Sequence, residues 1–424
     1  MKIQMSYGKS GLDIEIPDDH TRVLTMKNQK AVADPSIAIT KSLLKPIATP
    51  PLYDLAKGKK NACILICDIT RPVPNRILLP PILRTLGAAG MPKDKILILV
   101  ATGIHRPNFG DEINELVGPD IARDYRIENH MSREKSAHKN LGTSSRGTEM
   151  WIDERYANSD FKLVTGFIEP HLMAGFSGGR KLIVPGIAGV DTMKVMHGPH
   201  MMADANCREG IIDNNPFHEE ALEIAKTAGV DFSVHVALNE NKKITGIFSG
   251  HLEKAHLKGI EFVKDSVRAT VDEPVDIAIT SSAGYPLDKT WYQAIKGVTA
   301  AANVVKKGGT IILTAECSEG VGSKEFSQLV YDTKDLDSFL KKIFRKDFFV
   351  IDQWQLQKYA QVAKDINVIT VAGGLSKEQK NRMNIPWAET VTDALEQALK
   401  RHGKEASIAA IPKGPYVLSQ VEEK

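Results

Sequence analysis

The chain has 424 residues, which is enough for two or three domains with large hydrophobic cores. Its 55 basic and 52 acidic residues are scattered and give a formal net charge of +3, so we expect neither nucleic acid nor an acidic membrane surface as its main partner. The four cysteines are widely spread, and no apolar window approaches the roughly eighteen residues of a membrane span. Together these features predict a soluble protein of the reduced cytoplasm.

The first half of the chain alternates apolar runs with helical periodicity. A hairpin is expected at residues 2–16 and a helix-rich connection at residues 38–56. Residues 61–67 and 95–101 are continuous apolar runs, as expected for parallel strands that are covered on both faces. Between them, residues 76–89 repeat apolar residues at helical spacing, so this segment predicts a βαβ unit.

Polar loops follow the predicted strands at the point where each strand ends. The first strand runs into Asp68 and Arg71, and the second runs into a loop that contains His105. A third apolar run, residues 161–166, leads into the stretch 163–200, around which the rest of the chain is organised. Because ligands in open α/β sheets bind at the carboxyl ends of strands, these loops predict a common site.

The stretch 163–200 combines chain breakers, a glycine-rich turn, a lysine and histidines, a mixture that local structure does not require. Its glycine-rich turn lacks the ending of a phosphate loop and the spacing of a dinucleotide fingerprint, so we reject both motifs. A single histidine is more often a satisfied core or surface residue than a ligand, so the interpretation depends on the other loops. The residues expected to line the site are His171, Ser177, Gly178, Gly179, Lys181 and His197.

The remaining chain predicts a second α/β domain. In the first domain we still expect a helix at residues 215–228, paired strands at 231–238 and 243–248, and a helix at 251–271. A polar, proline-bearing segment then places the domain limits at 1–271 and 272–424. In the second domain, strands are expected at residues 275–280, 310–314, 367–371 and 407–411, and helices at 290–306, 324–345, 353–364 and 387–401. The predicted fold is therefore α/β, with two domains of mainly parallel sheets and a ligand cleft between them.

Several motifs occur in one order along nearly the whole chain. They are Asp68-x-x-Arg71-Pro72, Gly103-x-His105-Arg106-Pro107, Glu169-Pro170-His171, Gly178-Gly179-Arg180-Lys181, His197, Tyr285-Pro286-Leu287-Asp288 and Tyr292-Gln293-x-x-Lys296. In these motifs the chain resembles the nickel-dependent lactate racemase family. The resemblance implies a racemase or epimerase that interconverts the configuration at C2 of a 2-hydroxy acid, lactate-like or related.

The resemblance also implies a cofactor, which is a nickel-pincer nucleotide (pyridinium-3-thioamide-5-thiocarboxylic acid mononucleotide) built by separate biosynthetic enzymes. By motif position, Lys181 forms its covalent thioamide link and His197 supplies the remaining nickel ligand, with His200 as a nearby competitor. Soft sulfur and carbon donors with an imidazole suit Ni(II). The other predicted cofactor-binding residues are Asp68, Thr102, Gly103, Ser177, Gly178 and Gly179, of which all but Asp68 are expected to cradle the phosphate with backbone amides.

The implied reaction is reversible hydride transfer, because the α-hydrogen of a 2-hydroxy acid is too weakly acidic for an unaided base. Two histidines are then needed to take and return the hydroxyl proton, and His105 and His171 fit these roles. Asp68 would fix the tautomer of a catalytic histidine, and Arg71 would hold the substrate carboxylate. In an alternative interpretation, Asp68 and Arg71 only close their own loop.

A helix beginning near residue 290 is expected to close the site over the substrate. Gln293 and Lys296 stand three apart, so their side chains can share one helix face and bind the substrate carboxylate, with Tyr292 adding a hydroxyl. The alternative is an ordinary solvated helix start. Lys289 and Trp291 lie in the segment that is expected to face the substrate, and the family uses this segment for several different 2-hydroxy acids. Malate, longer aliphatic or aromatic 2-hydroxy acids and aldonic acids are therefore candidate substrates beside lactate. The alternative function is a non-catalytic cofactor- or metal-binding module of the same fold, but such a module would not need both candidate bases.

Overall fold

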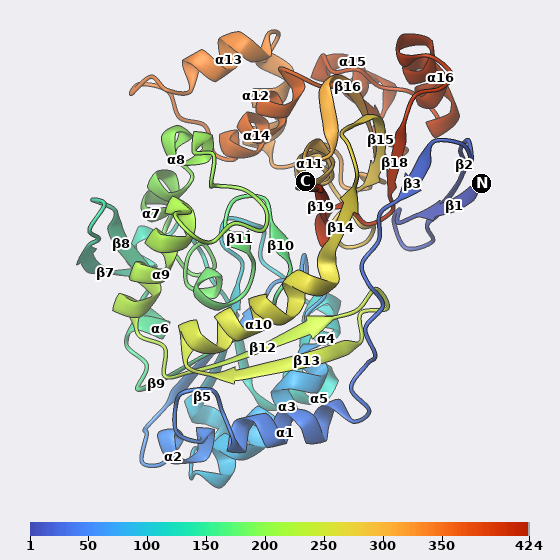
Figure 1. Ribbon diagram of the computed structural model, residues 1–424. Coiled ribbons are helices and arrows are strands. Elements are labelled where there is room, and N and C mark those ends of the chain that lie inside the picture. The colour runs from blue at the N-terminus through green and yellow to red at the C-terminus, as the bar shows by residue number, and fades with distance from the viewer. Residues whose placement is uncertain (423–424) are drawn as a thin grey trace.

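A computed structural model describes residues 1–422 and shows two α/β domains, one above the other in Figure 1. The first domain is built on a six-stranded sheet with the order β13-β12-β9-β4-β5-β6. Within it β13 pairs antiparallel to β12, and the other neighbours pair in parallel. In the order of the sheet, the strands are β13 (Ile244–Gly250), β12 (Phe232–Leu238), β9 (Phe161–Phe167), β4 (Ala62–Cys67), β5 (Ile96–Ala101) and β6 (Arg126–Asn129).

The apolar runs predicted as central strands are buried on both faces of this sheet. Ile64 of β4 lies in the core that includes Leu78 of α3, whereas its neighbour Leu65 lies in the opposite core with Ile183. The helices of this domain are α1 (Pro35–Leu44), α2 (Leu52–Ala56), α3 (Asn75–Ala88), α4 (Asp111–Val117), α5 (Pro119–Asp124), α6 (Glu154–Ala157), α7 (Val190–Met196), α8 (Pro199–Ala203), α9 (Pro216–Ala228) and α10 (Leu252–Val267). The predicted βαβ unit is thus formed by β4, α3 and β5.

The second domain is built on a five-stranded, all-parallel sheet with the order β17-β16-β15-β18-β3. Its strands are β17 (Asn367–Val371), β16 (Val305–Thr314), β15 (Val275–Ser281), β18 (Ile408–Ile411) and β3 (Thr21–Val23). Its helices are α11 (Trp291–Ala302), α12 (Lys324–Asp332), α13 (Leu336–Lys342), α14 (Gln353–Ala363), α15 (Lys377–Met383) and α16 (Val391–His402). The predicted α/β class, with two mainly parallel sheets, is confirmed.

Short elements complete the two domains. The two-stranded pairs are β1 (Lys2–Met5) with β2 (Leu12–Glu15), β7 (His138–Thr143) with β8 (Glu149–Asp153), β10 (Pro170–His171) with β11 (Gly175–Phe176), and β14 (Arg268–Val271) with β19 (Leu418–Val421). The 3-10 turns are η1 (Lys93–Lys95), η2 (Lys135–Ala137), η3 (Gly179–Leu182) and η4 (Gly414–Tyr416). The β1-β2 pair is the hairpin predicted at residues 2–16.

The N-terminal segment requires a correction to the predicted domain limits of 1–271 and 272–424. Strand β3 pairs in parallel with β18, so the N-terminus lies beside the second sheet, as the blue strands next to red β18 show in Figure 1. Met5 and Ile14 of the hairpin are buried with Ile277 and Ile408 of that sheet. The sequence could not predict that the N-terminal segment joins the second domain, because apolar alternation predicts a strand but not the sheet with which that strand pairs.

Four predicted helices also differ from the structure at their ends. The helix predicted at 290–306 ends at Ala302, and its last two predicted residues belong to β16, which begins at Val305. The helix predicted at 251–271 ends at Val267, because the next four residues form β14 against β19. The helix predicted at 324–345 is two helices, and Asp335 caps the second with its side chain. The helix predicted at 387–401 begins only at Val391, where Thr390 and Asp393 form a capping box.

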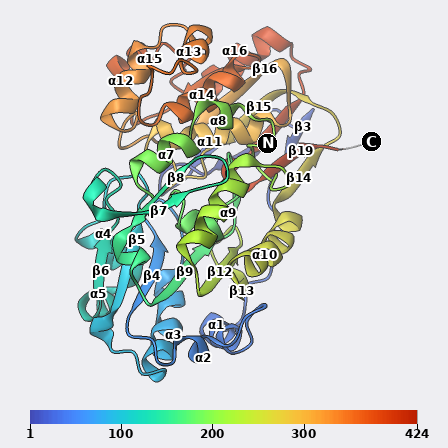
Figure 2. The same ribbon diagram turned by 90° about the vertical axis from the view of Figure 1, so that its left-hand side faces the viewer.

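The strand order explains where a ligand can bind. From β4 the chain proceeds to β5 and β6 on one side of the sheet, and later to β9 and β12 on the other side. The connections therefore diverge between β4 and β9, which is the switch point at which open α/β sheets bind ligands. In Figure 2 the second domain lies above this sheet, and α14 and α8, which contact each other, bridge the two domains.

Candidate active site

A cavity lies between the two domains, outside the carboxyl ends of β4, β5 and β9. It gathers nearly all predicted site residues, and two helices of the second domain, α11 and α14, form its other wall. From the first domain it is lined by Asp68, Arg71, Thr102, Gly103, His105, His171, Ser177, Gly178, Lys181 and His197; from the second, by Tyr292, Gln293, Lys296, Trp354 and Gln355. The expected ligand cleft between two domains is therefore present.

His105 is held between a carboxylate and an amide. Its Nδ1 lies 2.7 Å from Oδ2 of Asp68, and its Nε2 lies 3.3 Å from Nε2 of Gln293. Burial acts to raise the pKa of Asp68, but His105 and the hydrogen bond from Thr70 outweigh it, and the pKa is lowered. Asp68 is therefore a carboxylate that accepts the Nδ1 proton of His105. This leaves Nε2 of His105 as a proton acceptor that faces the cavity.

His171 lies in β10, in the loop that follows β9. Its Nδ1 accepts hydrogen bonds from the backbone N–H groups of Met173 and Ala174, both at 3.2 Å. Its Nε2 lies 2.7 Å from Nζ of Lys181. Burial lowers the pKa of His171 well below its usual value. His171 is therefore neutral, and with Nδ1 acting as an acceptor its proton is on Nε2.

His197 closes α7 and presents one ring nitrogen to the cavity. Its Nδ1 donates to the carbonyl oxygen of Met193 at 3.1 Å, and burial lowers its pKa to about 3. The imidazole is thus neutral, with the lone pair of Nε2 free. Trp354 packs against this ring at a centroid distance of 4.5 Å. The competitor His200 lies outside the lining and instead contacts Phe344, at 4.9 Å between ring centroids.

The cavity also holds two basic side chains, Arg71 and Lys296, beside a buried carboxylate. Nε of Arg71 lies 3.3 Å from Oε1 of Glu169, whose side chain is only 7% exposed. Burial raises the pKa of Glu169, whereas the charges of Arg71 and Lys296 act against this shift. Burial lowers the pKa of Lys296 well below its usual value. The alternative interpretation, in which Asp68 and Arg71 only pair with each other, is not what the structure shows, because Asp68 holds His105 and Arg71 holds Glu169.

The expected phosphate cradle is only partly available. The backbone amides of Thr102, Gly103 and Ser177 donate to the carbonyl oxygens of Val100, Gly186 and Glu169. These three amides are thus engaged within the protein, which corrects their predicted role as phosphate donors. Gly178 (φ +78°) and Gly179 (φ +55°) remain as candidates.

Gly179 lies just behind the cavity lining. A Cβ atom at Gly179 would come within 2.9 Å of the ring of His256, so only glycine fits there.

Several site residues carried no sequence signal. Trp354 and Gln355 come from α14, and Nε1 of Trp354 donates to the hydroxyl of Tyr292 at 3.1 Å. Helix α14 reads as an exposed polar segment, and its burial between the domains could not be predicted from its glutamines. Conversely, Trp291 belongs to the core of the second domain and Lys289 pairs with Glu319, and neither lines this cavity.

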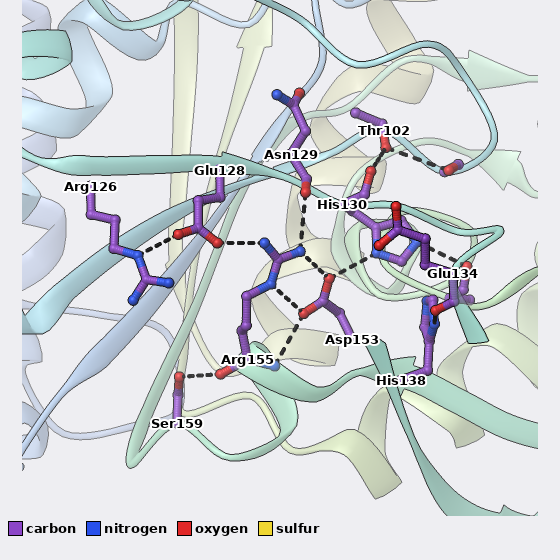
Figure 3. Close-up of polar contacts among 12 residues, drawn as sticks. Thr102, Arg126, Glu128, Asn129, His130, Glu134, His138, Asp153, Arg155 and Ser159 are labelled. Atoms are coloured by element: carbon purple, nitrogen blue, oxygen red, sulfur yellow. Dashed lines mark hydrogen bonds and ion pairs between the residues drawn. The ribbon is translucent and has the colours of Figure 1, made fainter. Parts of the chain in front are cut away.

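A buried polar network supports the loop that carries His105 (Figure 3). Thr102, three residues before His105, donates to the carbonyl oxygen of His130 at 2.8 Å. Nδ1 of His130 lies 3.0 Å from Oδ2 of Asp153, which also accepts from Arg155 at 2.6 Å. Burial acts to raise the pKa of Asp153, but the hydrogen bonds from Arg155 and His130 outweigh it and hold the pKa at about 2.

We expect Asp153→Asn to destabilise the protein by about 1–3 kcal/mol, because buried His130 loses its carboxylate partner, whereas Arg155 is partly exposed and keeps its pair with Glu128. Because the pKa of Asp153 is depressed, its contribution is complete above about pH 4 and is lost as the pH falls through about 2. Urea unfolding at neutral and acid pH measures both effects. The control is Asp120→Asn, which removes an ion pair whose carboxylate is 85% exposed; equal stability of the two variants would contradict the prediction.

The fold and the site together define a two-domain α/β enzyme whose cavity histidines, buried lysine and interdomain cavity are assembled from distant segments. Models of two families match the chain, the lactate racemase N-terminal domain over residues 7–210 and the lactate racemase C-terminal domain over residues 270–419. The chain belongs to the lactate racemase family. The predicted resemblance is thereby confirmed, and membership supports an isomerase of the racemase type.

Individual relatives agree with this assignment. The chain is 37% identical to a lactate racemase of Thermoanaerobacterium thermosaccharolyticum, over 100% of this chain and 99% of the relative. It is 36% identical to a lactate racemase of Lactiplantibacillus plantarum, over 98% and 99% of the two chains. These similarities extend over both domains.

Solved structures support the fold. The lactate racemase apoprotein of T. thermosaccharolyticum superposes with a TM-score of 0.91 at 36% identity, and the match covers 99% of this chain and 100% of that chain. A protein of Thermotoga maritima has a TM-score of 0.71 at 19% identity, over 92% and 99%, which shows the fold alone. Within residues 1–422, none of the helices has the length and apolar character needed to cross a membrane.

Proposed function

We propose that this protein is a racemase that inverts C2 of lactate or a closely related 2-hydroxy acid, using a nickel-pincer nucleotide attached to Lys181. The observation that carries the proposal is that His105, His171, Lys181 and His197 converge on one interdomain cavity from three separate loops. The two relatives at 36–37% identity bear the name lactate racemase, which favours lactate among the 2-hydroxy acids.

The residues present fit the proposed cofactor. His197 offers one free imidazole lone pair, and a backbone carbonyl fixes its other nitrogen, the arrangement typical of a metal-binding histidine. Among the residues that the structure describes, no cluster of three His, Cys, Asp or Glu side chains could hold a metal by itself. A metal here would need further donors from a bound group, and soft sulfur and carbon donors suit nickel. When bound, the cofactor would accept a hydride from C2 and return it to either face.

The side chains of the protein would handle the proton and the carboxylate. His105 would accept the hydroxyl proton at Nε2, and Asp68 would stabilise the resulting imidazolium through Nδ1. His171 is neutral with its single proton on Nε2, so it would act as the acid for the other face only after taking up a second proton. The two histidines would then serve as base and acid and exchange these roles between the two directions.

Arg71 and Lys296 are the groups proposed to bind the substrate carboxylate, one from each domain. Both line the cavity, and Arg71 can form two parallel hydrogen bonds to a carboxylate. Glu169 beside them keeps the cluster from accumulating positive charge before the substrate arrives. Closure of the second domain over the site would exclude water, which protects the hydride and the 2-oxo acid.

The experiment is to co-express the chain with the cofactor-building enzymes and to follow the optical activity of a panel of chiral 2-hydroxy acids. We expect lactate or a close analogue to racemise, and Lys296→Ala to raise KM or lower kcat without removing the cofactor. Lys307→Ala, which changes a lysine that is 83% exposed, is the control and should behave as wild type. A nickel-loaded protein that racemises none of the panel would overturn the proposal.

A further inference from the structure

The contact between Lys181 and His171 fixes the protonation of both side chains. Two backbone N–H groups point at Nδ1 of His171, so this nitrogen has no proton of its own. The single proton of the neutral ring is then on Nε2, which lies 2.7 Å from Nζ of Lys181. Because Nε2–H is the donor, Nζ must be the acceptor. An ammonium group has no lone pair to accept with, so the contact requires Lys181 to be a neutral amine.

The surroundings of Lys181 favour the same form. No carboxylate forms a hydrogen bond or ion pair with Nζ among residues 1–422. Burial lowers the pKa of Lys181 well below its usual value, the positive charges of Arg71, Arg180 and Lys296 lower it further, and Glu169 acts in the opposite direction. The charged and titratable groups that act on Nζ in this site are Arg71, Glu169, His171, Arg180, His197 and Lys296, together with the thiols of Cys67 and Cys207.

Arg180 is the unusual member of this set. Its side chain is 1% exposed, and it donates to the carbonyl oxygens of Ala174 at 2.6 Å and Gly178 at 3.3 Å. None of the ion pairs within residues 1–422 involves Arg180, and burial lowers its pKa to about 9, so it is still charged at neutral pH. A buried guanidinium without a carboxylate therefore lies directly before Lys181 in the chain and also holds two carbonyl groups of the segment that follows His171.

We propose that His171 and the unpaired charge of Arg180 hold Lys181 as a neutral amine in the cofactor-free protein, so that Lys181 reacts with acyl or thioacyl electrophiles at neutral pH. The proposal rests on the proposed function only for the identity of the natural electrophile. A desolvated lysine beside another cation is a recognised way to make this side chain nucleophilic. His171 thereby gains an earlier task than the one it has in racemisation.

The attachment reaction balances without an oxidant or a reductant. With a thiocarboxylic acid, a bond forms between Nζ and the acyl carbon, and the bond from that carbon to its oxygen breaks. The oxygen leaves as water, which takes one proton from the amine and one from the acid. The resulting thioamide nitrogen has no basic lone pair, so the contact with His171 is released and this histidine becomes available to the substrate.

The test is competitive acetylation of the full chain, made without the cofactor-building enzymes, with trace acetic anhydride at several pH values. Peptide mass spectrometry gives the ratio of label on Lys181 to label on Lys307, an exposed lysine in the same molecule. Lys307 should gain reactivity about tenfold per pH unit between about pH 6 and about pH 9, whereas Lys181 should change less than about twofold. The ratio should therefore fall about tenfold per unit, whatever the accessibility of each lysine.

Three variants connect this profile to the proposed groups. His171→Ala and Arg180→Met should each make labelling of Lys181 depend on pH by at least about tenfold between pH 7 and pH 9, and Arg180→Lys should restore the wild-type profile. His200→Ala is the control; this histidine lies outside the cavity, against Phe344, and its loss should leave the labelling profile of Lys181 unchanged.

A constant ratio in the wild-type protein, or no label on Lys181 at any pH, would overturn the proposal. So would an unchanged profile in His171→Ala. Each outcome is independent of the racemase assay, so failure of the proposed function would leave it interpretable.

Discussion

Lys181→Ala is expected to abolish the covalent cofactor adduct that we propose for wild-type protein co-expressed with the cofactor-building enzymes. Two lysines line the cavity, Lys181 and Lys296. Of these two, Lys181 is the one whose Nζ lies within hydrogen-bond distance of a histidine in the described site. Intact-mass spectrometry measures the adduct. Racemisation should fall to background in the same variant, because the cofactor is then no longer held beside the two histidines.

The matched control is Lys194→Ala on α7, whose side chain is 44% exposed and pairs with Asp191. It should retain both the added mass and the activity. His197→Ala separates the metal from the tether: we expect the organic adduct to remain while nickel, measured by elemental analysis, is lost. An unchanged adduct in Lys181→Ala would refute the assignment of the anchor, and full nickel content in His197→Ala would refute that of the metal ligand.

His105→Ala is expected to lower the rate of racemisation by at least about a hundredfold while the adduct and nickel remain. Removal of this imidazole deletes the proton acceptor that Asp68 orients, and neither residue is proposed to bind the metal. Initial rates measured from each enantiomer, together with intact mass, test both halves of the expectation. The loss should occur in both directions, because the histidine that is a base for one enantiomer is the acid for the other.

His200→Ala is the control for this experiment, because His200 lies outside the cavity and contacts Phe344 instead. Its rates should be close to those of the wild type. If His105→Ala also kept near-normal rates in both directions, the two-histidine scheme would be wrong. A variant that lost the adduct as well would instead show that His105 supports cofactor loading.

Local patterns in the sequence were sufficient for the central elements and for one wall of the site. The continuous apolar runs that became β4 and β5 can be read because a strand buried on both faces has no polar alternation. Parallel strands present their carboxyl ends at one edge, so the loops with Asp68, His105 and His171 could be expected to converge. The spacing of Gln293 and Lys296 likewise predicted that both would reach the cavity, as the structure shows.

Only the tertiary structure decided which segments meet across long distances. The pairing of β3 with β18, the burial of α14 between the domains and the approach of Gln293 to His105 each join residues far apart in the chain. No local propensity encodes such contacts, because they result from the packing of whole domains.

The protonation of Lys181 belongs to the same class of properties. It depends on two backbone N–H groups and on cations from separate loops, which meet only after folding. The sequence by itself thus determined which side chains are the candidates for the chemistry. The fold determined their charge and their partners, because burial and hydrogen bonding set these properties in three dimensions.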